Sequence, residues 1–311
     1  MKNKFINEVH IKGYLYEYNL EEAVAGEKAK HPGTQYIRGD IGIATDEECL
    51  NIVKIHYGYV TEKTSKNATN KLYLLLKDMI DGKIKTVVAD GKENAQKISA
   101  DTAIALNEFY PSNDQEKLVS VKRNDGGFLN LINTLEDDEK LRNQFKVDIL
   151  ITNARRIEAD EEREIPEKVI VKGAIFNYQK ELKPTEFTVV NPNAMDYFED
   201  LNASPNEPVF TKIWGRQISE TVVKKIVEES AFGDDSVREV TNTNKDYIIT
   251  GAAKEPYLWD DESTLTAEEL KNMMSEREIY LASLKQKAVE YSSNKGKTTT
   301  ATEVTDGGFN F

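Results

Sequence analysis

The chain has 311 residues, of which 31% are charged and 39% hydrophobic, and its formal net charge is −13. This length is sufficient for two domains of ordinary size, each with its own core. The negative charge excludes a protein that coats duplex nucleic acid by bulk electrostatics, because the neutralisation of phosphates requires clustered lysine and arginine.

Hydropathy and cysteine content indicate in which cellular compartment the protein is expected. No stretch approaches the roughly 18 consecutive apolar residues of a membrane span, so we expect a soluble protein with no membrane partner. Residues 1–10 lack the apolar core of a signal peptide, and the single cysteine, Cys49, cannot form an internal disulfide. These features predict a cytoplasmic protein.

The first half of the chain has the pattern of a β-rich domain. Runs of β-branched and aromatic residues predict strands, and apolar residues at helical spacing predict one helix that ends at an Asp-Gly pair. We expect strands at residues 9–18, 36–45 and 51–61, a helix at 68–80, two short strands within 85–110, and a closing strand at 145–157.

Alternation in the second and third strands assigns side chains to faces. Ile37, Ile41 and Ile43 are expected in the core, so the alternate residues between them face water. In the third strand, Tyr57 and Tyr59 fall on the predicted core face. The water-facing residues with stacking or cationic side chains are Tyr36, Arg38, Lys54 and His56.

Strands, one helix after the third strand, and further strands are the order of a small barrel of the OB type. We predict a mainly β protein with some α-helix, built from two tandem OB-like small β-barrels. The first domain covers residues 1–160 with insertions, and the second covers 161–265 and includes predicted helices at 191–201 and 220–231. A helix at 266–291, opened by a capping box of Thr266 and Glu269, and a disordered tail at 292–311 complete the chain.

Three sequence echoes support two copies of one unit. Residues 9–18 resemble 169–178 around a shared Lys-Gly pair, at Lys12-Gly13 and Lys172-Gly173. Residues 51–62 resemble 209–220, and residues 148–157 resemble 246–255. The echoes come in the same order in both halves, which favours a repeat. Chance similarity between β-rich segments is the alternative.

The sequence contains no pattern of a known catalytic site. Its three histidines, His10, His31 and His56, are scattered, and no HExxH, paired CxxC or P-loop motif occurs. Carboxylates gather in runs that have the pattern of solvated loops. We therefore expect no enzyme, no cofactor and no metal.

Binding of a single nucleic-acid strand requires aromatic faces for the bases and a few cations for the backbone. Strand alternation places Lys212, Trp214 and Arg216 on one face, and we interpret them as a stacking site between two cations. The alternative is a tryptophan that caps the barrel core, with the cations reaching outward to water.

The first domain offers a comparable set of residues. Its water-facing candidates Tyr36, Arg38, Lys54 and His56 form a predicted stacking patch on neighbouring strands, and residues 63–97 form a basic island in an acidic chain. Loops that could close over a strand contribute five further candidates: Lys63, Lys66, Lys122, Arg123 and Phe128.

The chain end DGGFNF resembles the terminal peptides of single-stranded DNA-binding proteins, in which acidic residues and a phenylalanine follow a flexible linker. Here the matching residues are Asp306, Phe309 and Phe311, although only Glu303 and Asp306 are acidic in this segment. The motifs VKGAIFNY and FTKIWGRQISE resemble those of single-stranded DNA-binding proteins of tailed phages of low-GC bacteria.

This resemblance implies a tandem-OB, sequence-tolerant binder of single-stranded DNA that acts in phage DNA replication or recombination, in the cytoplasm of the host cell. It also implies that the tail recruits replication or recombination proteins. RNA stays open as an alternative ligand, and so does a homo-oligomer. Two alternative functions are a virion or assembly protein with two β-modules, and an adaptor that binds a host protein through its acidic face.

Overall fold

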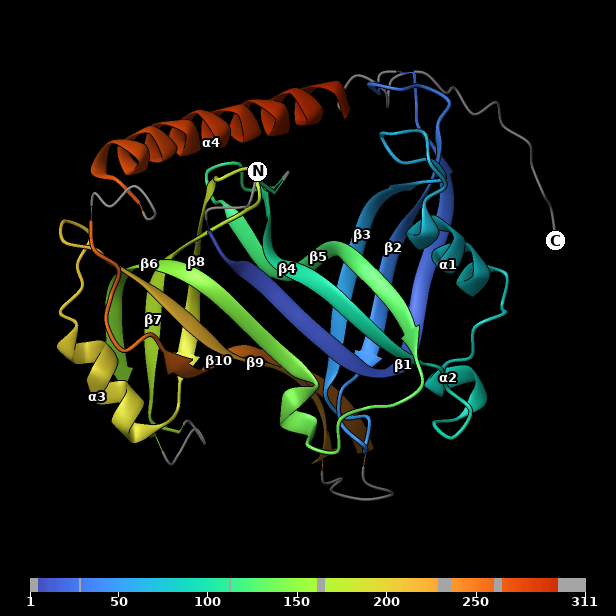
Figure 1. The fold of residues 1–311 in the computed structure, drawn as a ribbon, viewed down its shortest axis with the longest axis horizontal. Helices are drawn as coiled ribbons and strands as arrows, with labels where there is room; N and C mark the ends of the chain where they lie inside the picture. The colour runs from blue at the N-terminus through green and yellow to red at the C-terminus, as the bar shows by residue number, and fades with distance from the viewer. Residues whose placement is uncertain are drawn as a thin grey trace.

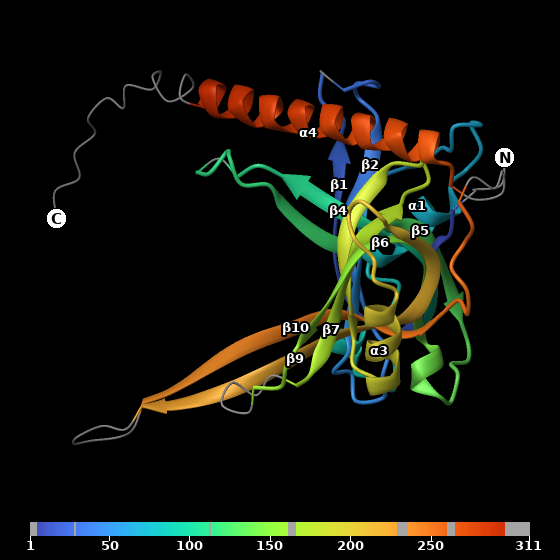
Figure 2. The same cartoon turned by 90° about the vertical axis from the view of Figure 1, so that its left-hand side faces the viewer.

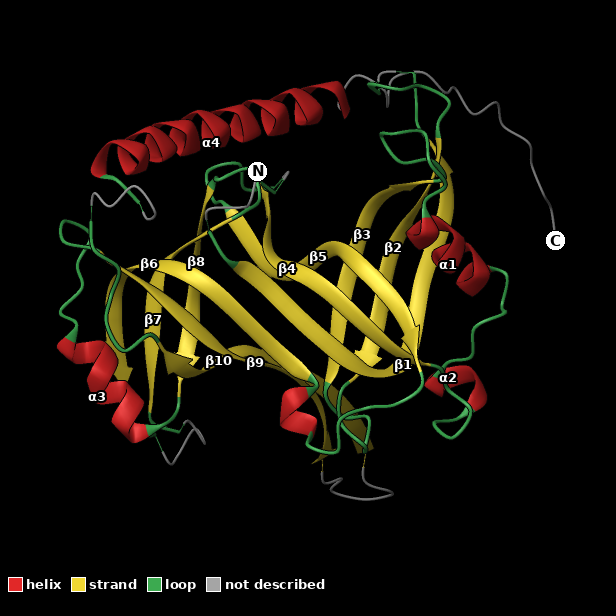
Figure 3. Ribbon diagram, in the orientation of Figure 1, coloured by secondary structure: helices red, strands yellow, loops and turns green. Residues whose placement is uncertain are grey.

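Within the described residues, ten β-strands form one continuous sheet that closes on itself twice (Figure 1). The computed structural model describes residues 5–27, 29–111, 113–160, 166–228, 236–259 and 265–295. Strands dominate, and the helices lie around them (Figure 3). In chain order the elements are β1 (Asn7–Val24), β2 (Gln35–Ala44), β3 (Ile52–Thr61), α1 (Lys71–Ile80), α2 (Val87–Asp90), β4 (Lys97–Phe109), β5 (Val119–Ile132), the 3₁₀ turn η1 (Glu139–Leu141), β6 (Asn143–Ile157), β7 (Lys168–Phe176), β8 (Leu182–Val189), α3 (Pro192–Asp200), β9 (Val209–Glu228), β10 (Ser236–Ala252) and α4 (Ala267–Lys295).

The first barrel has the strand order β2-β3-β5-β4-β1, and β1 pairs with β2 as well as with β4. β3 and β5 close the barrel by a short parallel pairing that matches Ile55 with Asn124. β1 changes partner near Gly13, where a Cβ would collide with the carbonyl oxygen of Ala44, so this position requires glycine. Five strands closed in this order form a barrel of the OB type.

The second barrel repeats this topology with β6-β7-β8-β10-β9, because β6 pairs with both β7 and β9. Its closure is again parallel, between Ile248 of β10 and Thr188 of β8. α3 follows the third strand of this barrel, as α1 follows the third strand of the first. The core of the second barrel includes an aromatic cluster in which Phe145 packs on Phe187 and Tyr247.

Strand pairing and buried side-chain hydrogen bonds join the barrels. β1 pairs antiparallel with β6 from Asn7 to Ile11, which makes one sheet of the two barrels. In addition, the side-chain amides of Asn124 on β5 and Gln217 on β9 exchange two hydrogen bonds of 2.9 Å, and both residues are buried. Asn143 on β6 binds the backbone of Gln217. The joint is therefore buried, and its polar groups are paired.

The predicted mainly β fold with two small barrels and a C-terminal helix is confirmed. The sequence echoes, however, match strands in different positions of the barrels. β1 is the first strand of its barrel and β7 the second, while β3 is a third strand and β9 a fourth. Gly173 of β7, like Gly13 of β1, packs against a backbone carbonyl, that of Leu150. The first echo therefore reflects a shared local requirement and not an equivalent position.

The strand pairing also bears on the domain boundary. Residues 145–157 were expected to close the first domain, whereas β6 is the first strand of the second barrel and pairs with β1 only at its start. We propose that the boundary lies in the connection at residues 133–142 and not at residue 160. This connection carries η1 and links β5 to β6.

Two predicted secondary-structure elements differ from those in the structure. Residues 220–231 were expected to be helical, but β9 continues to Glu228 and pairs with β10 as far as Ser236. This segment is rich in β-branched residues, whose restricted χ1 angles favour a strand over a helix. Residues 85–110 hold a single strand, β4, which the short helix α2 precedes.

α4 begins at the predicted capping box, in which the backbone amides of Thr266 and Glu269 each donate to the other's side chain. Met273 is buried in a small apolar cluster with Phe5, Phe176 and Phe210. The helix continues to Lys295, so residues 292–295 belong to it and not to the predicted disordered tail. The remainder of that tail lies outside the described residues.

In the described part of the chain, no helix combines the length and apolar character needed to cross a membrane.

The joint predicts a specific loss of stability. Asn124→Ala leaves the buried Gln217 amide without its partner, so we expect the free energy of unfolding to fall by about 1–3 kcal/mol. The exposed Asn130 on the same strand provides a matched control, and Asn130→Ala should change stability by less than about 0.5 kcal/mol. Urea denaturation measures both. Equal effects of the two substitutions would contradict a role of the amide pair in stability.

Candidate nucleic-acid interface

The outer face of β2 and β3 carries an aromatic pair. The rings of Tyr36 and Tyr59 lie 4.4 Å apart, centroid to centroid, with a tilt of 39°, and Tyr59 is 51% exposed. We call these two residues the tyrosine platform. The sequence prediction was right for Tyr57, which is 1% exposed, and wrong for Tyr59.

A β-bulge explains the position of Tyr59. Ile37 pairs with Val60 whereas Gly39 pairs with Tyr57, so β3 has one extra residue opposite β2. Because a bulge reverses the alternation of side chains beyond it, Tyr59 turns outward and Val60 turns into the core. The only sequence signal was Gly58, since glycine inside a strand often marks a bulge.

Three further predicted residues lie on the same two strands as the platform, and each contacts a carboxylate of the same barrel. The contacts join Arg38 to Glu21 (2.5 Å), Lys54 to Glu17 (3.1 Å) and His56 to Asp40 (2.9 Å). Exposed pairs of this kind contribute little stability, but they reduce the positive potential that a phosphate would meet. The structure thus spreads Tyr36, Arg38, Lys54 and His56 along the neighbouring strands β2 and β3, on a face of mixed charge.

The loop that follows β3 carries cations of a different character. Lys63 and Lys66 are exposed, and neither side chain has a hydrogen bond or ion pair with a described residue. The loop is ordered by an isolated bridge between Lys63 and Thr69. These two lysines therefore remain available to an external anion close to the end of β3.

On β9, the alternation prediction holds: Lys212, Trp214 and Arg216 share the outer face while Ile213 is fully buried. Trp214 lies over Gly251 of β10, where a Cβ would come within 2.7 Å of the indole, and is 40% exposed. The Lys212 ammonium lies 5.7 Å from the centre of the Tyr257 ring. Trp214 does not cap the core of the barrel.

The two predicted stacking sites do not meet. Trp214 pairs with Lys146 of β6 on the sheet that β6 shares with β9, whereas the tyrosine platform lies on β2 and β3 of the other barrel. Arg123 contacts Asp125 at 3.2 Å. Phe128, 74% exposed, lies on β5 opposite Asp101 of β4. The predicted aromatic residues therefore do not form one binding surface: they lie on β2 and β3, on β5 and on β9.

Lys122 belongs to the joint between the barrels and not to an open loop. Its ammonium lies 4.4 Å from the ring centre of Tyr247 and 4.8 Å from that of Phe187, and it donates to the carbonyl oxygen of Glu186. Burial lowers the pKa of Lys122 to about 8. Lys122 was predicted on a loop that closes over a strand, whereas it lies on β5 and its side chain packs against the second barrel. Its contact with nucleic acid stays a prediction.

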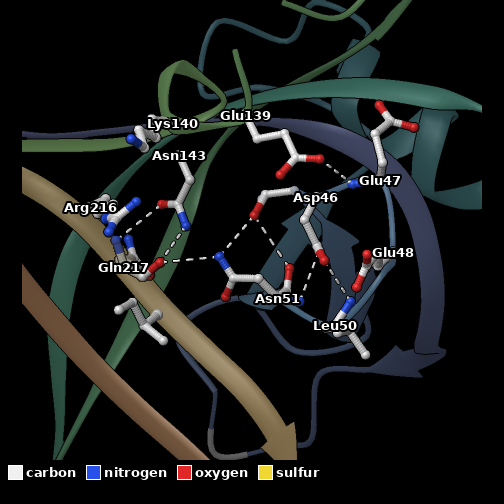
Figure 4. A pocket seen from close by; sticks show the side chains of 12 residues that line it. Asp46, Glu47, Glu48, Leu50, Asn51, Glu139, Lys140, Asn143, Arg216 and Gln217 are labelled. Atoms are coloured by element: carbon white, nitrogen blue, oxygen red, sulfur yellow. Dashed lines mark hydrogen bonds between the residues drawn. The ribbon is translucent and has the colours of Figure 1, made fainter. Parts of the chain in front are cut away.

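A cleft of about 590 Å³ lies between the barrels near the loop that joins β2 to β3 (Figure 4). Arg216 lines it, and its Nε atom is buried without a hydrogen-bond partner among the described residues. Opposite it, hydrogen bonds from Lys92 and Arg142 lower the pKa of Glu47 to about 2.

Among the described residues, no cluster of three or more histidine, cysteine or carboxylate side chains could hold a metal.

Sequence reasoning missed two cations on the second barrel. Arg155 of β6 and Lys172 of β7 are exposed, and neither side chain has an ion pair or hydrogen bond with a described residue. Asn153 pairs with Lys172, so Arg155 lies one diagonal step away on the same face. Strand alternation, which predicts outward positions, was the signal that could have identified them.

Comparison with known proteins gives one family and distant structural similarities. The model of the YorF family matches residues 6–287, and a comparison with curated proteins finds no match. The crystal structure of a deletion variant of the single-stranded DNA binding protein from Thermus aquaticus is similar at 13% identity and a TM-score of 0.46, over 83% of this chain and 97% of that one. A Replication Protein A heterotrimer bound to ssDNA is similar at 9% identity and a TM-score of 0.23, over 88% and 69%. Similarities at this level carry no conclusion about function.

The contact of Trp214 with Gly251 predicts a spectroscopic change. In a Trp259→Phe background, Gly251→Ala should displace the Trp214 indole, because the new methyl group occupies its place. We expect the tryptophan emission to shift to longer wavelength as the indole becomes more exposed to water. Gly58→Ala is the control, since a Cβ there meets only the His56 side chain, at 3.7 Å. An unchanged emission maximum in the Gly251 variant would contradict the packing.

The buried ammonium of Lys122 predicts a pH dependence. Its pKa of about 8 lies below the value of about 10.4 expected in the unfolded chain, so the unfolded state binds more protons between these limits. The stability of the wild type, relative to Lys122→Met, should therefore rise by about 2 kcal/mol between pH 7.5 and pH 10. Urea denaturation at both pH values tests this, and parallel pH profiles would refute it.

Proposed function

We propose that this chain, which belongs to the YorF family, binds single-stranded nucleic acid without reading its sequence. The observation that carries the proposal is the tyrosine platform, on the outer face of the second and third strands of a barrel of the OB type. OB folds use this face to bind oligonucleotides. An exposed aromatic ring there offers the flat surface on which a base stacks, whatever its identity.

Stacking is the main source of affinity in this proposal. Arg38 and Lys54, on the same strands as the platform, are paired with carboxylates, and the whole chain has a net charge of −13. Electrostatic attraction to phosphates is therefore limited. A stacked base contributes about 1–3 kcal/mol. Lys63 and Lys66, which have no ion pair within the described residues, supply the nearest phosphate contacts.

The finer parts of the function rest on sequence resemblance. We propose that the ligand is single-stranded DNA, with RNA as the alternative, and that the protein acts in phage DNA replication or recombination in the cytoplasm of the host cell. We propose also that the tail residues Asp306, Phe309 and Phe311, which lie outside the described residues, bind a replication or recombination protein. A homo-oligomer is compatible with this function.

Titration of fluorescently labelled oligo-dT, followed by anisotropy at low salt, tests the proposal. Tyr59→Ala should weaken binding roughly 5- to 150-fold, because it removes a stacking contact of about 1–3 kcal/mol. Tyr291 on α4, 65% exposed, provides the matched control, and Tyr291→Ala should bind as the wild type does.

Two outcomes would contradict the proposal. A wild-type protein that does not change the anisotropy of oligo-dT at low salt, where phosphate contacts are strongest, does not bind single strands. Equal affinities of Tyr59→Ala and the wild type would remove the tyrosine platform from the interface. A large oligomer that ignores nucleic acid would instead favour a virion or assembly protein.

A further inference from the structure

A groove of about 500 Å³ separates the second barrel from a hairpin of the first. The hairpin, which we call the β4–β5 arm, consists of residues 105–109 of β4 and 119–123 of β5 with the loop between them. Leu106, Ser120 and Lys122 line the groove from the arm, and Lys172 and Glu186 line it from the outer face of β7 and β8. Figure 2 shows the β4–β5 arm and the β9–β10 hairpin projecting to the same side of the molecule.

α4 holds the arm in place. Arg277 of this helix makes a two-pronged ion pair with Glu108 of β4, and the Glu108 side chain is only 1% exposed. Further along, Lys285 contacts Glu116 at 2.6 Å and Ser292 accepts a hydrogen bond from Gln115. The arm is thus attached at its stem and at its loop, so it forms a fixed wall of the groove.

The charges around the groove differ from those around the tyrosine platform. Lys172 and Arg155 have no carboxylate partner among the described residues, whereas the cations of the platform are paired. Glu186 lies across the strands from Lys172. Asp246 accepts a hydrogen bond from Thr188 and, like Glu186, acts on the Lys122 ammonium, whose pKa it raises against the lowering effect of burial. Neither carboxylate lies within 4.0 Å of the Lys172 ammonium. These cations are therefore available to an external anion.

We propose that the groove and the adjoining face of β6 and β7 hold the sugar–phosphate backbone of a single strand, through Lys172 and Arg155. This inference rests on the proposed function and divides the work between the barrels. The first barrel stacks bases on tyrosines, with Lys63 and Lys66 as its phosphate contacts, and the second barrel holds further phosphates along the strand. Lys122 contributes positive potential from the arm side of the groove, because its ammonium carries a proton at neutral pH.

The dependence of affinity on salt tests this division. Each phosphate contact to a single strand adds about 0.7 to the slope of log K against log salt concentration. The double variant Arg155→Gln/Lys172→Gln should therefore reduce the magnitude of this slope for oligo-dT by about 1.4. The matched control is Lys271→Gln/Lys287→Gln, which removes the same charge from exposed positions on α4. The control should retain the wild-type slope.

The outcomes separate this inference from the proposed function. If the groove variant has the slope and affinity of the control, the proposed phosphate contacts of Lys172 and Arg155 are overturned. The proposed stacking of bases would still stand in that case if Tyr59→Ala loses binding. A slope that falls equally in both double variants also overturns it, because the effect would then follow from net charge. If the wild type fails to bind oligo-dT, the proposed function fails together with the inference. Thermal unfolding of each variant confirms that the exposed substitutions leave the fold unchanged.

Discussion

The arrangement of the molecule depends on the buried joint between its two barrels. The pairing of β1 with β6 makes a single sheet, and the amide exchange between Asn124 and Gln217 fixes the barrels around it. Buried amides must be paired, since an unpaired one costs about 1–3 kcal/mol. The joint therefore favours one relative orientation, and this orientation decides which surfaces face one another. The groove beside β7 and β8 exists only because β5 of the first barrel reaches across to the second.

Charge pairing gives the two barrels different surfaces. On the first barrel, carboxylates of β1 pair with Arg38 and Lys54, which lie on the same strands as the tyrosine platform. On the second, Arg155 and Lys172 have no such partner among the described residues, while Arg156, next in sequence, contacts Glu167, Asp196 and Glu199. An acidic chain can present positive charge only where its carboxylates are engaged elsewhere. α4 adds to this arrangement, because Arg277 neutralises the buried Glu108 of the arm.

Sequence patterns predicted those features that depend on local periodicity. Alternation placed Trp214 on an outer face and Ile37 in the core, and the capping box located the start of α4. Sequence patterns did not predict the features that are set by tertiary contacts. The bulge that turns Tyr59 outward depends on the pairing of β3 with β2, and the burial of Lys122 depends on a strand of the other barrel. The Lys-Gly echo suggested equivalent strands, although Gly13 and Gly173 share only a close approach to a neighbouring carbonyl.

The central claim is that bases stack on the tyrosine platform of the first barrel. Photo-crosslinking of oligo-dT that carries 5-iodouracil, followed by mass spectrometry of the peptides, tests it most directly, since this base crosslinks to aromatic rings on which it stacks. The account predicts crosslinks at Tyr59 and Tyr36, which compete away with unlabelled oligo-dT. Crosslinks confined to Trp214 or Phe128, with none on β2 or β3, would contradict it.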